Sequence, residues 1–346
     1  PIKMWVAAIL SSIIMTLFVV FGGVWSAGIG GVVKIILLCL SSLAAGIIVL
    51  FLSNGLPGII ESIHNTLLNT DLNLINELSS TKDVDSIYIF PFARGVSKDV
   101  GSCISVILGV LSTQTYAQAI WSGKKDSNAQ KGAMISALIS IPIGFACILV
   151  GMYMRANYIT ADEANALAMI GKEIPENMGV MASSAQAFPM FVTQHMPKFI
   201  GGIVLGTLLI TIIIGGSGLT LGISTILVND VFRRSKDLAV TRVTIVMIQL
   251  IAFIVASSFS NRYINDLGFL SMGLRAASTF VPLSLAIFFP GRFKPKWVLA
   301  SIIVGTAALI VTEVLSLPID SIYCGLLCSI ICCMFGIKRN NTIKNI

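Results

Sequence analysis

Long apolar runs dominate the chain and are separated by shorter polar segments. Between Met4 and Ile60 the only charged residue is Lys34, and the stretches 100–123, 132–154, 199–229 and 243–261 carry no charge. A helix that crosses a bilayer needs roughly 20 apolar residues, whereas a membrane β-barrel shows short alternating segments. The pattern therefore predicts about nine spanning helices, at 4–21, 27–53, 98–120, 132–154, 200–228, 240–259, 266–289, 297–316 and 319–337.

Composition agrees with this pattern. Of the 346 residues 55% are hydrophobic and 11% charged, against about 25% charged in soluble domains. The net charge of +7 comes from basic residues between the apolar runs, which is typical of cytoplasmic loops rather than of a nucleic-acid-binding surface. We predict an all-α, polytopic integral membrane helix bundle that has the lipid bilayer as a partner and binds no nucleic acid.

The distribution of charge predicts an orientation. Short loops on one side hold most of the lysines and arginines, including Lys124, Lys125, Arg233 and Arg234, while two long loops near 54–98 and 155–199 hold most of the carboxylates. Short basic loops face the cytoplasm. We therefore expect a multi-pass protein of the cytoplasmic membrane with a cytoplasmic C-terminus. Nine spans then place Pro1 outside, so we expect further helices upstream of this chain.

Both long loops contain helix signals. The segment Leu56–Ile63 can form a short amphipathic helix, and Thr160–Glu163 has the pattern of a capped helix start. Long ordered loops often act as lids, and solvated connections are the alternative.

No cluster of metal ligands is visible in the sequence. Cys324, Cys328 and Cys332 lie four residues apart without an accompanying His or carboxylate, and His64 and His195 have no partners at useful spacing. We expect no metal site and no bound cofactor. No catalytic cluster is visible either, so we do not expect an enzyme.

Three segments resemble the sodium:solute symporter family, which has the leucine-transporter-like inverted-repeat fold. They are Gly22–Ala27 (GGVWSA), the stretch from Gly109 to Gly132, and the stretch from Phe188 to Asp230. The resemblance implies that residues 1–346 form a single transmembrane domain of core helices four to ten plus two C-terminal helices. Core helices one to three would lie upstream.

The resemblance also implies a function, secondary active transport of a small solute with Na⁺ or H⁺ as the coupling ion. Thr113 and Gln114 fall on family substrate-contact positions, Tyr116 could act as a gate, and Gln118 belongs to the same polar patch. The alternative for these side chains is hydrogen bonding between helices. The alternative function is a transporter-like solute sensor without flux. The sequence does not specify an oligomeric state.

Arg275 lies about eight residues into an apolar span. An arginine at the bilayer centre costs roughly 2.5–3.5 kcal/mol on insertion scales, so it normally faces a cavity or a partner. We expect Arg275 to bind the carboxylate of an anionic substrate. The alternative is an ion pair with a residue outside this chain.

The family's sodium ligands are altered in this sequence. Its Ser-Thr pair in the eighth core helix corresponds here to Ile214 and Gly215, with Ser217 nearby, and Lys34 stands in the fifth core helix where the family often has a polar residue. Sodium, like other hard cations, needs oxygen ligands. We hypothesise that Lys34 replaces the bound cation and couples transport to a proton; the alternative is that Lys34 snorkels to the membrane surface.

Overall fold

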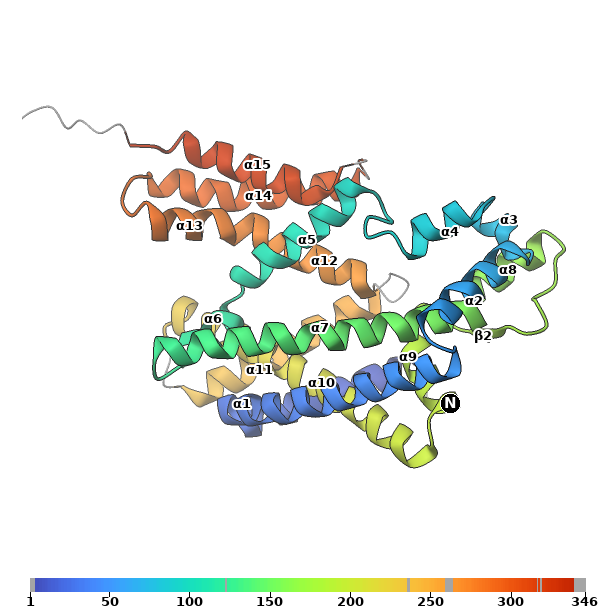
Figure 1. Cartoon of the computed structure of the whole chain (residues 1–346). Coiled ribbons are helices and arrows are strands. Elements are labelled where there is room, and N and C mark those ends of the chain that lie inside the picture. The colour runs from blue at the N-terminus through green and yellow to red at the C-terminus, as the bar shows by residue number, and fades with distance from the viewer. Residues whose placement is uncertain are drawn as a thin grey trace, which may run out of the picture. The chain divides into compact units, whose positions relative to one another are not determined.

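The computed structural model describes residues 4–121, 123–234, 237–258, 264–315, 317 and 319–338 and is mostly helical (Figure 1). The chain divides into two compact units, Pro1–Tyr88 with Gly123–Asn261, and Ile89–Ser122 with Arg262–Ile346. Each unit is described by itself.

Unit 1 contains long helices and a set of short elements between them. The long helices are α1 (Met4–Leu52), α7 (Asp126–Asn157), α10 (Lys198–Thr225), which continues as a π-helical turn η2 (Ile226–Val231), and α11 (Leu238–Ser258). The short elements are α2 (Leu56–Leu68), α3 (Leu72–Asn76), α4 (Thr81–Tyr88), β1 (Tyr158–Thr160), α8 (Ala161–Met169), β2 (Gly179–Met181), the 3₁₀ turn η1 (Ser184–Gln186) and α9 (Ala187–His195). Strands β1 and β2 pair in parallel.

Unit 2 consists of helices only, within the part that the structure describes. They are α5 (Val96–Leu111), α6 (Gln114–Trp121), α12 (Ile264–Arg275), a π-helical turn η3 (Ala276–Phe280), α13 (Val281–Phe288), α14 (Pro295–Val314) and α15 (Ser321–Met334).

Among the described residues, seven helical segments are long and apolar enough to cross a membrane: Trp5–Gly22, Gly30–Leu52, Asp126–Asn157, Lys198–Val231, Leu238–Ser257, Leu267–Phe288 and Pro295–Val314. The prediction of a polytopic helical membrane protein is therefore confirmed. Two predicted spans differ. The segment 98–120 is divided between α5 and α6, and the segment 319–337 forms the 14-residue α15.

Helix α1 contains both of the first two predicted spans in one helical run. A Cβ placed on Gly30 would lie 3.0 Å from Ile214 Cδ1, and one placed on Gly216 would lie 2.9 Å from Met15 Sδ. Met15 and Gly30 would be about 22 Å apart along a straight helix, whereas Ile214 and Gly216 are about 3 Å apart along α10. Helix α1 therefore folds back between Met15 and Gly30, so its two halves meet α10 at one level.

The hydrogen bonds of Thr113 mark the division between α5 and α6. The Thr113 hydroxyl donates to the carbonyl of Gly109 at 2.6 Å, the acceptor that the Thr113 amide would use in a continuous helix. The amide of Thr113 donates instead to Val110 O at 3.1 Å. The amide of Thr113 thus bonds three residues back instead of four, and α5 ends at Leu111 before α6 begins at Gln114.

The two long loops of unit 1 build a folded cap, residues 56–88 and 158–196, rather than solvated connections. Its core contains buried apolar side chains from α2, α3, α4, α8 and α9 together with residues of α1, α7 and α10: Val49, Ile59, Ile63, Leu67, Leu72, Val84, Leu149, Met154, Ile159, Leu167, Phe191 and Val204. The amphipathic helix predicted at Leu56–Ile63 is confirmed as α2. This continuous core fixes the cap on the ends of the long helices.

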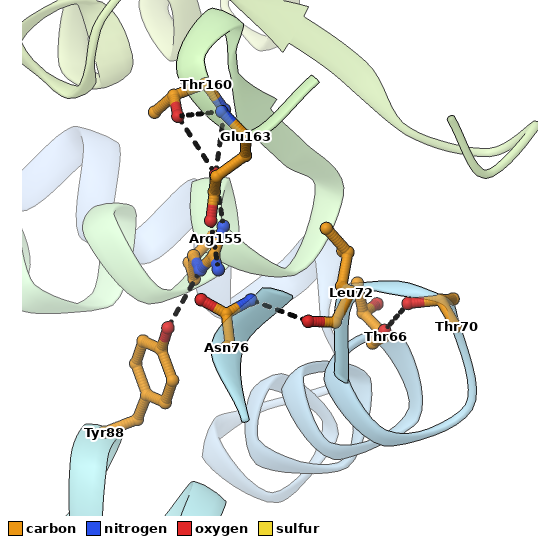
Figure 2. A network of polar contacts seen from close by, with 8 residues as sticks. All are labelled: Thr66, Thr70, Leu72, Asn76, Tyr88, Arg155, Thr160 and Glu163. Carbon is orange, nitrogen blue, oxygen red and sulfur yellow. Dashed lines mark hydrogen bonds and ion pairs between the residues drawn. The ribbon is translucent and has the colours of Figure 1, made fainter. Parts of the chain in front are cut away.

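A polar network joins the parts of the cap (Figure 2). Arg155 makes a two-pronged ion pair with Glu163 at 2.7 and 3.0 Å and donates to Tyr88 Oη at 2.9 Å. Glu163 also accepts the amide of Thr160 at 3.0 Å, while the Thr160 hydroxyl accepts the amide of Glu163. The capping box predicted at Thr160–Glu163 is thus confirmed. The network ties α4, α7 and α8 together.

The carboxyl of Glu163 is held in its charged form. Burial raises the pKa of Glu163, but the hydrogen bonds from Thr160 and the charge of Arg155 outweigh burial, so the net pKa lies below its usual value. A carboxyl with a depressed pKa stabilises the fold above its unfolded-state pKa, and this stabilisation is lost as the pH falls through the folded-state value.

We predict that Glu163→Gln lowers the melting temperature of the detergent-purified protein by about 2–5 °C at neutral pH, because Arg155 then keeps a half-buried charge without its partner. The difference from wild type should shrink as the pH falls below the ordinary pKa of a glutamate, about 4.3, and disappear once the native carboxyl is also protonated. Glu173→Gln serves as the control, since Glu173 is exposed. An equal effect of the two substitutions contradicts the role of the ion pair.

Candidate functional site

Arg275 is the last residue of helix α12, and among the described residues its guanidinium contacts neutral side chains. Nη1 donates to Thr113 Oγ1 at 3.2 Å and lies 3.8 Å from Met272 Sδ, and Nη2 donates to Ser271 Oγ at 3.0 Å. The side chain is half-buried. Hydroxyl groups orient the guanidinium plane, but they do not neutralise its charge.

The ion pairs of the described residues lie elsewhere. They are His64–Asp85, Arg94–Asp99, Arg155–Glu163 and Lys172–Asp71. No carboxylate in the described part of the chain is therefore within 4.0 Å of Arg275. Within the part of the chain that the structure describes, the positive charge thus has hydrogen-bond acceptors but no carboxylate partner, which leaves N–H groups for an anion.

Thr113 and Arg275 are the two predicted site residues that contact each other directly. The hydroxyl proton of Thr113 is used by the bond to Gly109 O, so the oxygen presents its lone pair to Arg275. Thr113 is buried and sits in the gap between α5 and α6. Interrupted helices expose backbone and polar groups at membrane depth in transporters, and here the interruption places a fixed acceptor beside the arginine.

A close helix crossing sets this geometry. A Cβ placed on Gly109 would lie 2.6 Å from Met272 O and 2.8 Å from Met272 Cβ, distances that side chains do not adopt. Glycine at 109 is thus required for α5 to approach α12 this closely. The crossing lies about one turn before Thr113, which follows the end of α5, and about one turn before Arg275 on α12. It therefore brings the side chains of Thr113 and Arg275 into contact.

The backbone after Arg275 is equally constrained. The π-helical turn η3 begins at Ala276, and both Ala276 and Ala277 are fully buried. A Cβ placed on Gly305 would lie 2.8 Å from Ala277 O, and one placed on Gly325 would lie 3.0 Å from Ala277 Cβ. Helices α14 and α15 therefore clamp the turn. Single π-turns inside α-helices occur frequently at functional sites, and this one fixes where the α12 helix presents Arg275.

The remaining predicted substrate residues are placed less specifically. Gln114 is the first residue of α6 and is half-buried, and Tyr116 on the same helix is 43% exposed. Within the described residues neither side chain contacts Arg275 by a hydrogen bond. The side chain of Gln118 lies outside the described part of the structure. The roles of these three residues stay predictions.

The three predicted ion-coupling residues all belong to unit 1, where α1 meets α10. Ser217 is buried and its hydroxyl donates to Ile213 O of its own helix. A Cβ placed on Gly215 would meet no atom within 4 Å, so this glycine borders open space. Lys34 is half-buried one turn beyond Gly30, the residue that packs on Ile214. The Lys34 side chain makes no hydrogen bond to another described residue.

Sequence reasoning missed Ser271 and Met272 as partners of Arg275. Both lie on α12 at the i−4 and i−3 positions from Arg275, which face the same side of a helix, so the spacing itself could have identified them. It also missed Thr211 on α10, whose Oγ1 is buried without a hydrogen-bond partner among the described residues. Within the described residues, no group of three or more His, Cys, Asp or Glu side chains gathers to hold a metal ion.

Comparison with known proteins gives consistent results. Residues 2–305 match the model of the sodium:solute symporter family. One relative is a sodium/glucose cotransporter of Vibrio parahaemolyticus, which is 24% identical over 209 residues; the match covers 56% of this chain and 36% of the relative. The chain thus aligns with little more than a third of that relative's length.

We predict that Gly109→Ala destabilises the protein and lowers its melting temperature by about 2–6 °C, because the added methyl group collides with the backbone of Met272. Gly144→Ala is the matched control, since a Cβ at this helical glycine meets nothing within 4 Å and alanine favours the helix by up to about 1 kcal/mol. A Gly109→Ala protein as stable as the control protein contradicts the close crossing.

Proposed function

The chain belongs to the sodium:solute symporter family, and on this premise we propose that it is a secondary active transporter of a small anionic solute in the cytoplasmic membrane. The observation that carries the proposal is the charge of Arg275, which lies within a helix long and apolar enough to span a membrane and whose partners among the described residues are neutral. The distribution of basic loops supports a cytoplasmic C-terminus.

The anionic character of the substrate follows from the cost of the arginine. A guanidinium at membrane depth is retained only where it has a polar cavity or a partner. A carboxylate can accept two parallel N–H bonds from it, and such charge-assisted bonds are roughly twice as strong as neutral ones. A neutral sugar would leave the charge uncompensated, so we infer that the substrate differs in charge from that of the sodium/glucose cotransporter relative.

The neutral partners of Arg275 suit a substrate that must bind and leave. Thr113 and Ser271 fix the guanidinium plane without competing for its charge. A resident carboxylate would hold the arginine in an internal ion pair, and an anionic substrate would then have to displace it. We further propose, from the family resemblance, that Gln114, Tyr116 and Gln118 supply polar contacts to the rest of the solute.

The coupling ion is the second part of the proposal. Two features argue against a sodium site at the family position: the Ile214 side chain has no oxygen, and Gly215 has no side chain. We propose that the Lys34 ammonium occupies the place of the cation and that a proton gradient drives transport.

The substrate proposal predicts a charge-selective binding loss. Small carboxylates should raise the melting temperature of the purified wild-type protein, whereas D-glucose should not. Arg275→Gln should abolish the carboxylate effect, which corresponds to a loss of binding of at least about tenfold for one charge-assisted bond pair, and Arg275→Lys should restore it only in part, because lysine lacks the planar fork.

The matched control is Arg292→Gln, which removes a charge from the exposed segment between α13 and α14. The control protein should keep the response to carboxylates. Stabilisation by D-glucose that survives in Arg275→Gln contradicts an anionic substrate. A solute sensor, the alternative function, would bind the carboxylate in this assay and show no flux in liposomes.

The coupling proposal predicts the driving force. In proteoliposomes, uptake of a radiolabelled carboxylate that binds should follow an imposed pH gradient and be indifferent to a Na⁺ gradient of equal size. Lys34→Met should uncouple uptake from the pH gradient. Uptake that follows sodium and ignores pH rules out substitution of the cation by Lys34.

A further inference from the structure

A cluster of basic side chains lies in unit 2 where α13 ends, α14 begins and α15 ends. Its members are Arg292, Lys294, Lys296 and Lys338. All four are exposed, and none makes an ion pair with another described residue. The cluster thus concentrates positive charge on a small part of the surface of this unit.

The acidic residues of unit 2 stand at the other ends of its helices. Asp266 is near the start of α12, Glu313 near the end of α14, and Asp320 directly before α15. Asp99 is in the first turn of α5, which lies beside the start of α15 because Tyr323 Oη donates to Ser97 O at 3.1 Å. No carboxylate of this unit is therefore near the basic cluster in the part of the chain that the structure describes.

A short backbone bridge holds the cluster together. Phe293 pairs with Ile337 in antiparallel fashion. On either side of this pair, the backbone amides of Lys294 and Lys338 donate to the opposite segment at 2.8 and 2.9 Å. Position 292 therefore faces position 338, and position 294 lies on the same side as 292 because side chains alternate along extended backbone. The bridge gathers Arg292, Lys294 and Lys338 on one side.

An exposed aromatic pair adjoins the cluster. The rings of Trp297 and Phe335 lie 5.6 Å apart between centroids, and both are exposed. A Cβ placed on Gly336 would lie 2.6 Å from Trp297 Cβ, so only glycine allows the end of α15 to approach α14 this closely. Trp297 lies in the first turn of α14, a helix long and apolar enough to cross a membrane. Tryptophan gathers at this level, the membrane–water interface.

Two of the cations oppose each other without an anion between them. The Arg292 guanidinium lies over the ring of Phe289, 5.7 Å from its centroid, and the Lys338 ammonium donates to Gly291 O at 3.0 Å. Like charges directly opposite each other across a pair of extended segments are destabilising. The Lys338 ammonium has two further N–H groups and that of Lys294 has three donors, so an anion bound to these ammonium groups would relieve the repulsion.

From this arrangement we propose that the cluster binds the headgroup of an anionic phospholipid of the surrounding bilayer. The lipid phosphate lies between the ammonium groups of Lys294 and Lys338, and the upper part of an acyl chain covers Trp297 and Phe335. The charge of Arg292, which is stacked on Phe289, adds to the positive field of the site.

The position of the cluster argues for a lipid as its ligand. The segment 289–294 joins Leu267–Phe288 and Pro295–Val314, both of which are long and apolar enough to cross a membrane. A short connection between two spans lies in the headgroup layer, and basic clusters beside spans attract anionic lipids. A free phosphate ion matches the ammonium groups equally well, but it leaves the aromatic pair uncovered.

The test measures the melting temperature of the full chain in detergent with equal mole fractions of phosphatidylglycerol or phosphatidylcholine, which differ in headgroup charge. Wild type should melt at least about 2 °C higher with phosphatidylglycerol. Lys294→Gln with Lys338→Gln should lose this difference, because two basic residues near an anionic surface strengthen binding by about 30-fold. Lys294→Arg with Lys338→Arg keeps both charges and should retain the difference, since arginine also binds phosphate.

The matched control is Lys124→Gln with Lys125→Gln, which removes two charges from the exposed segment before α7 in unit 1. The control protein should keep the rise that is specific to phosphatidylglycerol. An equal loss in both double variants overturns a defined site and indicates diffuse attraction of the basic surface. A rise that persists in Lys294→Gln with Lys338→Gln overturns the role of these two lysines.

Two further outcomes concern the ligand. Sodium phosphate that stabilises wild type as much as phosphatidylglycerol does contradicts a phospholipid ligand and indicates a site for the free anion. Wild type that melts at the same temperature in both lipids contradicts the site altogether. Should the double glutamine variant fail to fold, the single variants Lys294→Gln and Lys338→Gln take its place in the same series.

Discussion

A polar group in the hydrocarbon core of a membrane must find its partner inside the protein, because no water is present to replace it. The described structure follows this constraint closely. Hydroxyl side chains on α10 bond to carbonyls of their own helix, and Gln249 on α11 donates to Thr220 at 2.8 Å. Against this background the charge of Arg275 stands out, because among the described residues it has hydrogen-bond acceptors but no carboxylate partner.

The site around Arg275 shows how backbone geometry prepares a charged group for a ligand. The hydroxyl of Thr113 donates to Gly109 O and therefore presents its oxygen as an acceptor to the guanidinium. The glycine contact with Met272 draws the two helices together, and the packing around Ala277 fixes the turn that follows. All of these interactions involve neutral groups, so they orient the Arg275 side chain and leave its charge free to bind an anion.

Much of the fold could be predicted from the apolar runs, because a spanning helix requires a long stretch of apolar, uncharged residues. The fold-back of α1 agrees with the boundary predicted near Gly22 and Gly23, and the capping box at Thr160 depends only on residues three apart. The division of α5 from α6 was not predicted, because the stretch 100–123 is uncharged throughout and hydropathy does not show where its backbone hydrogen bonds change.

Part of the candidate site could also be predicted from the sequence. Arg275 stood out because a lone charge in an apolar span is costly, and Thr113 because polar residues cluster around it. Their contact depends on the crossing at Gly109, which involves residues more than 160 positions apart in the sequence. Thr211 gave no signal, since a threonine in a membrane helix usually bonds to its own backbone and only packing reveals the exception. The folded cap likewise depends on long-range pairing of its two loops.

The central claim is that the charge of Arg275 is accessible and available to an anion. Modification of the detergent-purified protein with the arginine reagent phenylglyoxal, read by mass spectrometry of the peptide that carries Arg275, tests this most directly. The account predicts that Arg275 is modified in buffer without carboxylates and is protected when a small carboxylate is present. An Arg275 that resists modification under both conditions, or that is modified equally in both, contradicts it.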